Sequence, residues 1–86
     1  MRKVTLAPGV IEQLQNYKAG QQKLVFKIFE LLADIQKTPF QGKGKPEPLK
    51  GDLSGFWSRR IDQEHRLLYK ITEEEIQVLS CFGHYE

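Results

Sequence analysis

Apolar residues recur at helical spacing in the first half of the chain and at every second position in the last third. The stretch QQKLVFKIFELLADIQK has the clearest helical pattern: Leu24, Ile28, Leu31 and Ile35 form one apolar row, and Val25, Phe29 and Leu32 widen it. Thr38-Pro39 ends this helix, because the residue before a proline is disfavoured in a helical conformation. A shorter helix is predicted from Pro8 to a stop at Gly20, so the two helices form a hairpin.

Three segments with the alternating pattern of strands follow: 56–61 (FWSRRI), 66–71 (RLLYKI) and 76–82 (IQVLSCF). Their short connections, DQEH and TEEE, predict an antiparallel meander, and the simplest register sets Arg66 opposite Ile61 and Cys81. A terminal or edge strand is predicted at 3–6, and the glycine- and proline-rich segment 40–55 is expected to be irregular. We therefore predict one α+β domain over residues 1–86, with the helices on one face of a mostly antiparallel sheet.

Positive charge is concentrated in the middle of the chain. The net charge is +2, but residues 37–70 hold eight basic and four acidic residues, a net +4, and the remainder carries −2. This distribution favours an anionic partner, with RNA or DNA first, although a solvated lysine-rich loop explains the charge equally well. The segment supplies four predicted RNA contacts: Lys43, Lys45, Arg59 and Arg60.

The single cysteine and the lack of a long apolar run indicate where in the cell the chain is expected to act. Cys81 cannot form an intrachain disulfide, and inside a predicted strand it is expected to be an inert core thiol. The N-terminus MRKVTLAPGV is followed by no apolar run typical of a signal peptide or membrane span. We expect a cytoplasmic protein that has no membrane partner.

Several polar residues are predicted to meet at one edge of the sheet. Arg66 begins the middle strand of the meander, and Gly83 permits a bend that turns His84 and Tyr85 toward it. Glu47 lies between two prolines in the basic loop, which presents its carboxylate in few conformations. Taken singly, each of these residues is more often structural or exposed, and their convergence is what points to a site.

This set suits cleavage of RNA through its own 2′-hydroxyl. The reaction needs a base for the 2′-proton, a cation for the phosphorane and an acid for the leaving 5′-oxygen. Glu47 is the predicted base, Arg66 the phosphate clamp and His84 the acid, since an imidazole ordinarily titrates near neutrality. We expect no metal and no cofactor, because His65, His84 and the carboxylates lack the spacing of a common metal site.

The run TPFQGKGKPEPLKGDLSGFWSRRIDQEHRLLYKI, with the terminal CFGHY, closely resembles the YoeB family of bacterial toxins, within the RelE-like messenger-RNA interferases. The resemblance covers roughly the last 50 residues, and the first 36 are similar in helical pattern only. It implies a fold like that of the microbial ribonucleases and a toxin that enters the ribosomal A site, cuts messenger RNA there and inhibits translation.

The resemblance also implies residue roles and partners. Glu47 corresponds to the general base, Arg66 to the phosphate-stabilising arginine, His84 to the general acid, Tyr85 to an aromatic that orients the substrate, and Lys50 to a lysine at the phosphate. The partners are the ribosome, messenger RNA and a YefM-like antitoxin whose C-terminal segment wraps the toxin, and a homodimer is possible within the family.

Two other functions are compatible with the sequence. RelE-like scaffolds also include toxins that act on gyrase, and a fold alone does not fix activity. A non-catalytic RNA-binding module would use the lysines for phosphates and Phe56 or Trp57 for stacking on bases. The joint presence of Glu47, Arg66, His84 and Tyr85 favours the nuclease.

Overall fold

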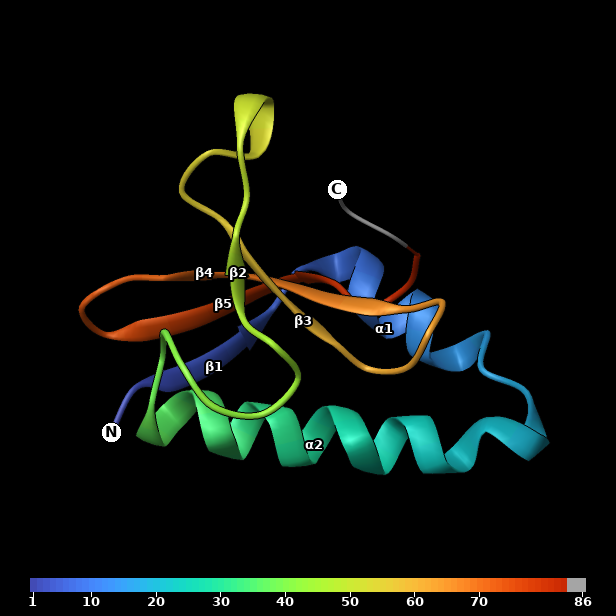
Figure 1. The fold of residues 1–86 in the computed structure, drawn as a ribbon. Helices are drawn as coiled ribbons and strands as arrows, with labels where there is room; N and C mark the ends of the chain where they lie inside the picture. The colour runs from blue at the N-terminus through green and yellow to red at the C-terminus, as the bar shows by residue number, and fades with distance from the viewer. Residues whose placement is uncertain (84–86) are drawn as a thin grey trace.

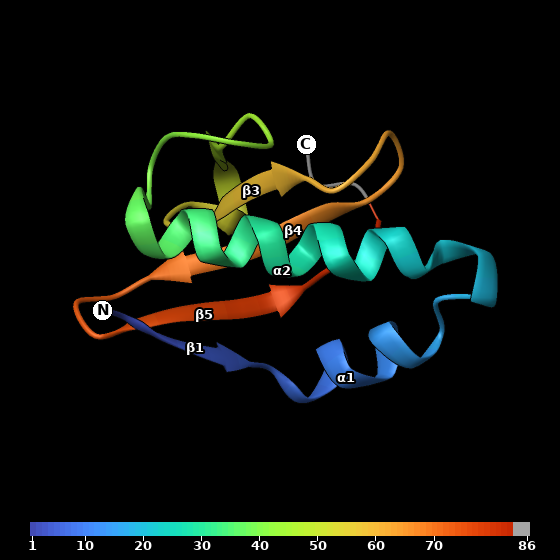
Figure 2. The ribbon, with the colours of Figure 1, turned by 90° about the horizontal axis from the view of Figure 1, so that it is seen from below.

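A five-stranded sheet forms the centre of the molecule, and helix α2 (Gln22–Lys37) lies across one of its faces (Figures 1 and 2). The computed structural model describes residues 1–83, apart from the side chain of Ala19. The sheet order is β1-β5-β4-β3-β2, with β1 parallel to β5 and the other pairs antiparallel. The strands are β1 (Lys3–Leu6), β2 (Glu47–Pro48), β3 (Trp57–Arg60), β4 (Arg66–Ile71) and β5 (Glu75–Ser80). The α+β prediction, the edge strand and the meander are confirmed.

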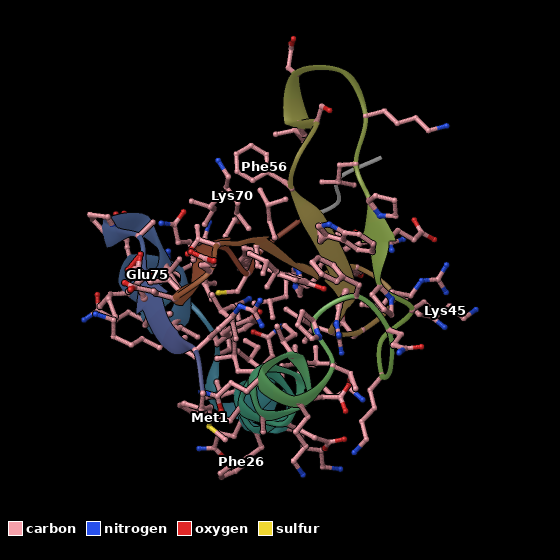
Figure 3. The ribbon with its side chains drawn as sticks, turned by 90° about the vertical axis from the view of Figure 1, so that its left-hand side faces the viewer. Met1, Phe26, Lys45, Phe56, Lys70 and Glu75 are labelled. Atoms are coloured by element: carbon pink, nitrogen blue, oxygen red, sulfur yellow. The ribbon has the colours of Figure 1, made fainter. Side chains whose placement is uncertain are left out.

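Helix α2 follows its predicted pattern over most of its length. Ile28, Leu31 and Ile35 of the apolar row are buried against the sheet, and the helix stops before Thr38 as predicted. Phe29 is 62% exposed, so the apolar face of α2 is narrower than the sequence pattern indicates. Phe26 lies on the face of the helix that points away from the sheet (Figure 3).

Helix α1 (Pro8–Gln15) is shorter than predicted and packs against the end of β5. It stops well before Gly20, because Tyr17 leaves the helix and its hydroxyl donates to the Cys81 carbonyl at 2.7 Å. The 3-10 helix η1 (Ala19–Gln21) then leads into α2. A second 3-10 helix, η2 (Gly51–Leu53), follows β2.

The sequence predicted that segment 40–55 is irregular. The structure corrects this in part, because the segment contains strand β2. Glu47 pairs with Ser58, and the Leu49 amide donates to the Phe56 carbonyl at 2.9 Å. Pro46 and Pro48 favour this extended backbone. A proline cannot donate to a ladder, which restricts such a strand to the sheet edge that β2 occupies.

The predicted register of Arg66 is wrong on both sides. Arg66 pairs with Arg60 rather than Ile61, because the Ile61 and Asp62 amides both donate to the His65 carbonyl and close the turn one residue earlier. On the other side, a bulge between Leu68 and Tyr69 shifts β5 by one residue. The Arg66 amide consequently donates to the Gly83 carbonyl at 2.9 Å instead of pairing with Cys81.

Arg59 is fully buried between β3 and α2, so its predicted role as an RNA contact is wrong. Neighbouring residues of a strand point to opposite faces, and Arg59 faces the helix while Arg60 is exposed on the other side. Its guanidinium pairs with Asp34 at 2.6 Å. It also donates to the Tyr69 hydroxyl and to three backbone carbonyls, those of Thr38, Gln41 and Lys43.

The loop after α2 is packed tightly around this Arg59 cluster, defined as Arg59, Asp34, Tyr69 and the three carbonyls. Gly42 has a φ of 119°, and a Cβ there would lie 2.2 Å from the Asp34 carboxylate. The Lys43 amide donates to the same carboxylate at 2.9 Å, and with Arg59 it lowers the pKa of Asp34. The cluster therefore fixes the loop that leads to β2.

The buried thiol of Cys81 is part of the core. The predicted position of this thiol in the core is confirmed, and burial raises the pKa of Cys81 to about 11. Neither helix in the part of the chain that the structure describes is long and apolar enough to cross a membrane.

Replacing Arg59 by methionine is expected to lower the free energy of unfolding by about 3–5 kcal/mol, because Asp34, the Tyr69 hydroxyl and three backbone carbonyls all lose their hydrogen-bond donor. The same change at exposed Arg60, one residue away, is the matched control and is expected to alter it by at most about 0.5 kcal/mol. Urea unfolding of both variants measures the difference. Equal losses at the two positions would contradict the structural role of Arg59.

Cys81 in the folded chain is expected to resist modification by Ellman's reagent at pH 8, since its thiol is both buried and protonated there. The urea-unfolded chain should react quickly and supplies the control. Absorbance of the released thionitrobenzoate follows the reaction. Fast stoichiometric labelling of the native chain would show that the thiol is accessible.

Candidate active site

A cavity of about 400 Å³ opens on the face of the sheet opposite the Arg59 cluster. Its lining residues are Glu47, Pro48, Leu49, Lys50, Leu53, Arg60 and Arg66. Three predicted site residues, Glu47, Lys50 and Arg66, therefore meet in this Glu47 cavity, and Arg60 joins them. A larger hollow, about 490 Å³, lies near the N-terminus around Arg2, Gln36 and Glu73, and it contains none of the predicted site residues.

The strand register explains why the charged side chains of the Glu47 cavity share one face. Directly paired residues of neighbouring strands point to the same side of a sheet, and so do residues two apart in one strand. Glu47 pairs with Ser58, and Arg60 pairs with Arg66. Since Ser58 and Arg60 are two apart, Glu47, Arg60 and Arg66 all project from the face that Arg59 does not use.

Lys50 enters the cavity from the segment that stands out from the sheet. It lies between β2 and η2, and η2 is the short coil at the tip of the projection at the top of Figure 1. Lys50 and Glu47 are exposed, whereas Arg66 is 8% exposed. The cavity thus has one carboxylate and three cations, two of them guanidinium groups that can each donate two hydrogen bonds to a phosphate.

His84 and Tyr85, predicted as the acid and the orienting aromatic, lie outside the described residues. The residue before them, Gly83, is joined to the central strand, because its carbonyl accepts a hydrogen bond from the Arg66 amide at 2.9 Å. Gly83 has a φ of 95°, a conformation that favours glycine, so the predicted bend is confirmed. The chain therefore reaches His84 from a point beside Arg66.

The two remaining predicted RNA contacts lie away from the Glu47 cavity. The Lys43 ammonium bonds Glu30 of α2 at 3.1 Å and, through that hydrogen bond, lowers the pKa of Glu30. Lys45 is exposed and points outward (Figure 3), beside a shallow hollow that Lys27 and Arg60 also line. Lys45 and Arg60 thus form a basic margin next to the cavity, and Lys43 is paired with the helix.

The aromatic residues considered for base stacking both have contacts within the chain. Trp57 is partly buried, and its ring centroid is 5.1 Å from that of Phe40. The Lys70 ammonium is 5.6 Å from the centroid of the Phe56 ring, and the two side chains lie side by side in Figure 3. Neither ring lines the Glu47 cavity.

The sequence did not predict that His65 contacts Gly83, because His65 was considered only as a metal ligand. It is buried, and its Nδ1 accepts a hydrogen bond from the Gly83 amide at 3.1 Å. The sequence signal that could have identified His65 is its position directly before Arg66. Among residues 1–83, no three His, Cys, Asp or Glu side chains lie close enough together to hold a metal ion.

Comparison with known proteins identifies the family. The profile of the YoeB-like toxin of bacterial type II toxin-antitoxin systems matches residues 7–85, so the similarity begins far ahead of the run that first suggested it. Toxin YoeB of Escherichia coli K12 is 56% identical over 69 residues, which are 80% of this chain and 82% of that protein.

Two solved structures extend the match to the whole fold. The heterotetrameric YoeB-YefM complex from Staphylococcus aureus contains a chain that is 40% identical, with a TM-score of 0.86 over 99% of both chains. The YoeB dimer from the same organism is also 40% identical, with a TM-score of 0.88 over 98% of both chains. With its sequence and its fold both matched, this chain belongs to the YoeB family of type II toxins.

Proposed function

We propose that this toxin is a ribosome-dependent endoribonuclease that cuts messenger RNA in the ribosomal A site and thereby inhibits translation. The observation that carries the proposal is the Glu47 cavity, in which Glu47, Lys50 and Arg66 meet as the cleavage chemistry requires. The family membership supports the toxin class. The proposal adds to it the substrate, the reaction and the residues that perform it.

The cleavage begins with the 2′-hydroxyl of the RNA, so the protein supplies no nucleophile. Glu47 takes the 2′-proton while the oxygen attacks the adjacent phosphorus. Arg66 and Lys50 stabilise the negative charge on the phosphorane, with Arg60 beside them. His84 then protonates the leaving 5′-oxygen, and Tyr85 orients the substrate. The products are a 2′,3′-cyclic phosphate and a free 5′-hydroxyl, and no metal takes part.

An open cavity is suited to an RNA substrate that the ribosome holds in place. The site lies on the surface of a sheet in a chain of 86 residues, which encloses little of an RNA strand by itself. Orientation of the reacting groups accounts for a large share of catalysis, and the ribosome would supply it by holding the codon in place. Lys45 and Arg60 offer cations beside the cavity for ribosomal RNA.

The partners follow from the relatives. The Staphylococcus aureus protein forms a complex with YefM and is also known as a dimer, and we infer a YefM-like antitoxin and a homodimer for this chain. An acidic antitoxin segment would compete with RNA for the same cations. Action on ribosomes would take place in the cytoplasm.

Glu47→Gln is expected to lower the cleavage rate about 10²–10⁴-fold, because the amide cannot take the 2′-proton. Cleavage of a defined messenger on purified ribosomes measures it. Glu73→Gln is the control, as this exposed carboxylate lies outside the Glu47 cavity and should leave the rate unchanged. His84→Ala should lose activity like Glu47→Gln, and full activity in both variants would refute the mechanism.

Brief induction of the toxin should produce new messenger 5′ ends at A-site codons within translated regions, and sequencing of 5′ ends maps them. The Glu47→Gln toxin, expressed equally, supplies the background. Supercoiling defects without new 5′ ends would favour a gyrase toxin. Salt-sensitive RNA binding without cleavage, even on ribosomes, would favour a non-catalytic RNA-binding module.

A further inference from the structure

The last described residues, Cys81 to Gly83, follow β5 and are held at both ends of the segment by other elements. The Cys81 amide donates to Gln13 Oε1 at 2.8 Å, and its carbonyl accepts from the Tyr17 hydroxyl at 2.7 Å. The Gly83 amide and carbonyl bond His65 Nδ1 and the Arg66 amide. The segment therefore has a defined path although it is no longer part of the sheet ladder.

The hydrogen bond at His65 fixes the form of its imidazole. A backbone amide can only donate, so Nδ1 must carry a lone pair, and the ring proton of the neutral imidazole lies on Nε2. The backbone of His65 is fixed as well, because its amide donates to Asp62 Oδ1 at 2.6 Å and its carbonyl closes the turn with Ile61. The acceptor for Gly83 is consequently held in place by the rest of the chain.

Two aromatic rings hold the imidazole in position. The Phe82 ring meets it edge to face with centroids 4.4 Å apart, and Tyr17 stacks on Phe82 at 5.1 Å. Tyr17 also meets the imidazole edge to face at 5.8 Å. Burial raises the pKa of the Tyr17 phenol, so its hydroxyl remains a donor to Cys81. The ring cluster leaves His65 little freedom to rotate away from Gly83.

We propose that His65 is a positioning residue for catalysis, which anchors Gly83 so that His84 and Tyr85 meet the phosphate held by Arg66. This inference rests on the proposed nuclease function. Only one peptide unit separates Gly83 from His84, so the anchored glycine sets the region that the acid reaches. His65 and Arg66 are adjacent in sequence, and both form hydrogen bonds with Gly83. These two residues therefore connect the proposed phosphate-binding arginine to the segment that leads to the proposed acid.

Two substitutions at His65 separate the hydrogen bond from the packing. His65→Phe keeps an aromatic ring against Phe82 but has no acceptor for the Gly83 amide. His65→Asn loses the ring but carries an oxygen at the position of Nδ1. If His65 acts through Gly83, the cleavage rate constant falls in the order wild type, His65→Asn, His65→Phe. If His65 serves packing alone, His65→Phe is the more active variant.

The kinetic test is single-turnover cleavage on programmed ribosomes, with thermal unfolding of each variant. We expect His65→Phe to lower the rate constant at saturating toxin about 10- to 100-fold, with little change in the concentration for half-saturation. His65→Asn should recover part of that loss. Cleavage by His65→Phe at the wild-type rate would overturn the proposal, and so would rates that follow thermal stability.

Nuclear magnetic resonance tests the anchor without reference to cleavage. The His65 imidazole should show an unprotonated Nδ1 in long-range ¹H–¹⁵N spectra, and the Gly83 amide should exchange slowly with solvent in the wild type and His65→Asn, but fast in His65→Phe. Absence of cleavage by the wild type would refute the nuclease function. A Gly83 amide that exchanges equally fast in wild type and His65→Phe would refute the anchor itself.

Discussion

The pairing of buried Arg59 with partly buried Asp34 is the interaction on which the arrangement of this toxin depends. An unpaired guanidinium in the core is costly, and the chain satisfies it with a carboxylate, a phenol and three carbonyls from three separate parts of the molecule. These contacts join the end of α2, the following loop and the sheet. Because that loop runs directly into β2, the position of Glu47 depends on a charge on the far side of the sheet.

Two segments of the chain, each held by its own contacts, thus form the candidate site. Glu47 arrives through the loop around Arg59, and the C-terminal segment arrives through His65, Tyr17 and Gln13. Arg66 lies between them, at the start of the central strand β4. Contacts to the sheet therefore position both segments, and the sheet is the frame of the candidate site.

Local pattern predicted the elements of this fold and part of its site. Helix α2 and strands β3 to β5 have clear periods, and Gly83 was identified as a bend because no side chain resists a positive φ. Arg59 and Arg60 could not be told apart, since alternation puts adjacent arginines on opposite faces without saying which face is buried. The bulge beside Leu68 and the short pairing of β2 depend on tertiary contacts, and the register of Arg66 failed for that reason.

The parallel pairing of β1 with β5 has a consequence for the biosynthesis of the toxin. Lys3 pairs with Glu75, so β1 has no partner in the sheet until β5 has been synthesised. Contacts between the two ends of a chain form late and favour folding after release rather than during synthesis. The sheet of the nascent toxin is consequently incomplete until β5 has emerged from the ribosome that makes it.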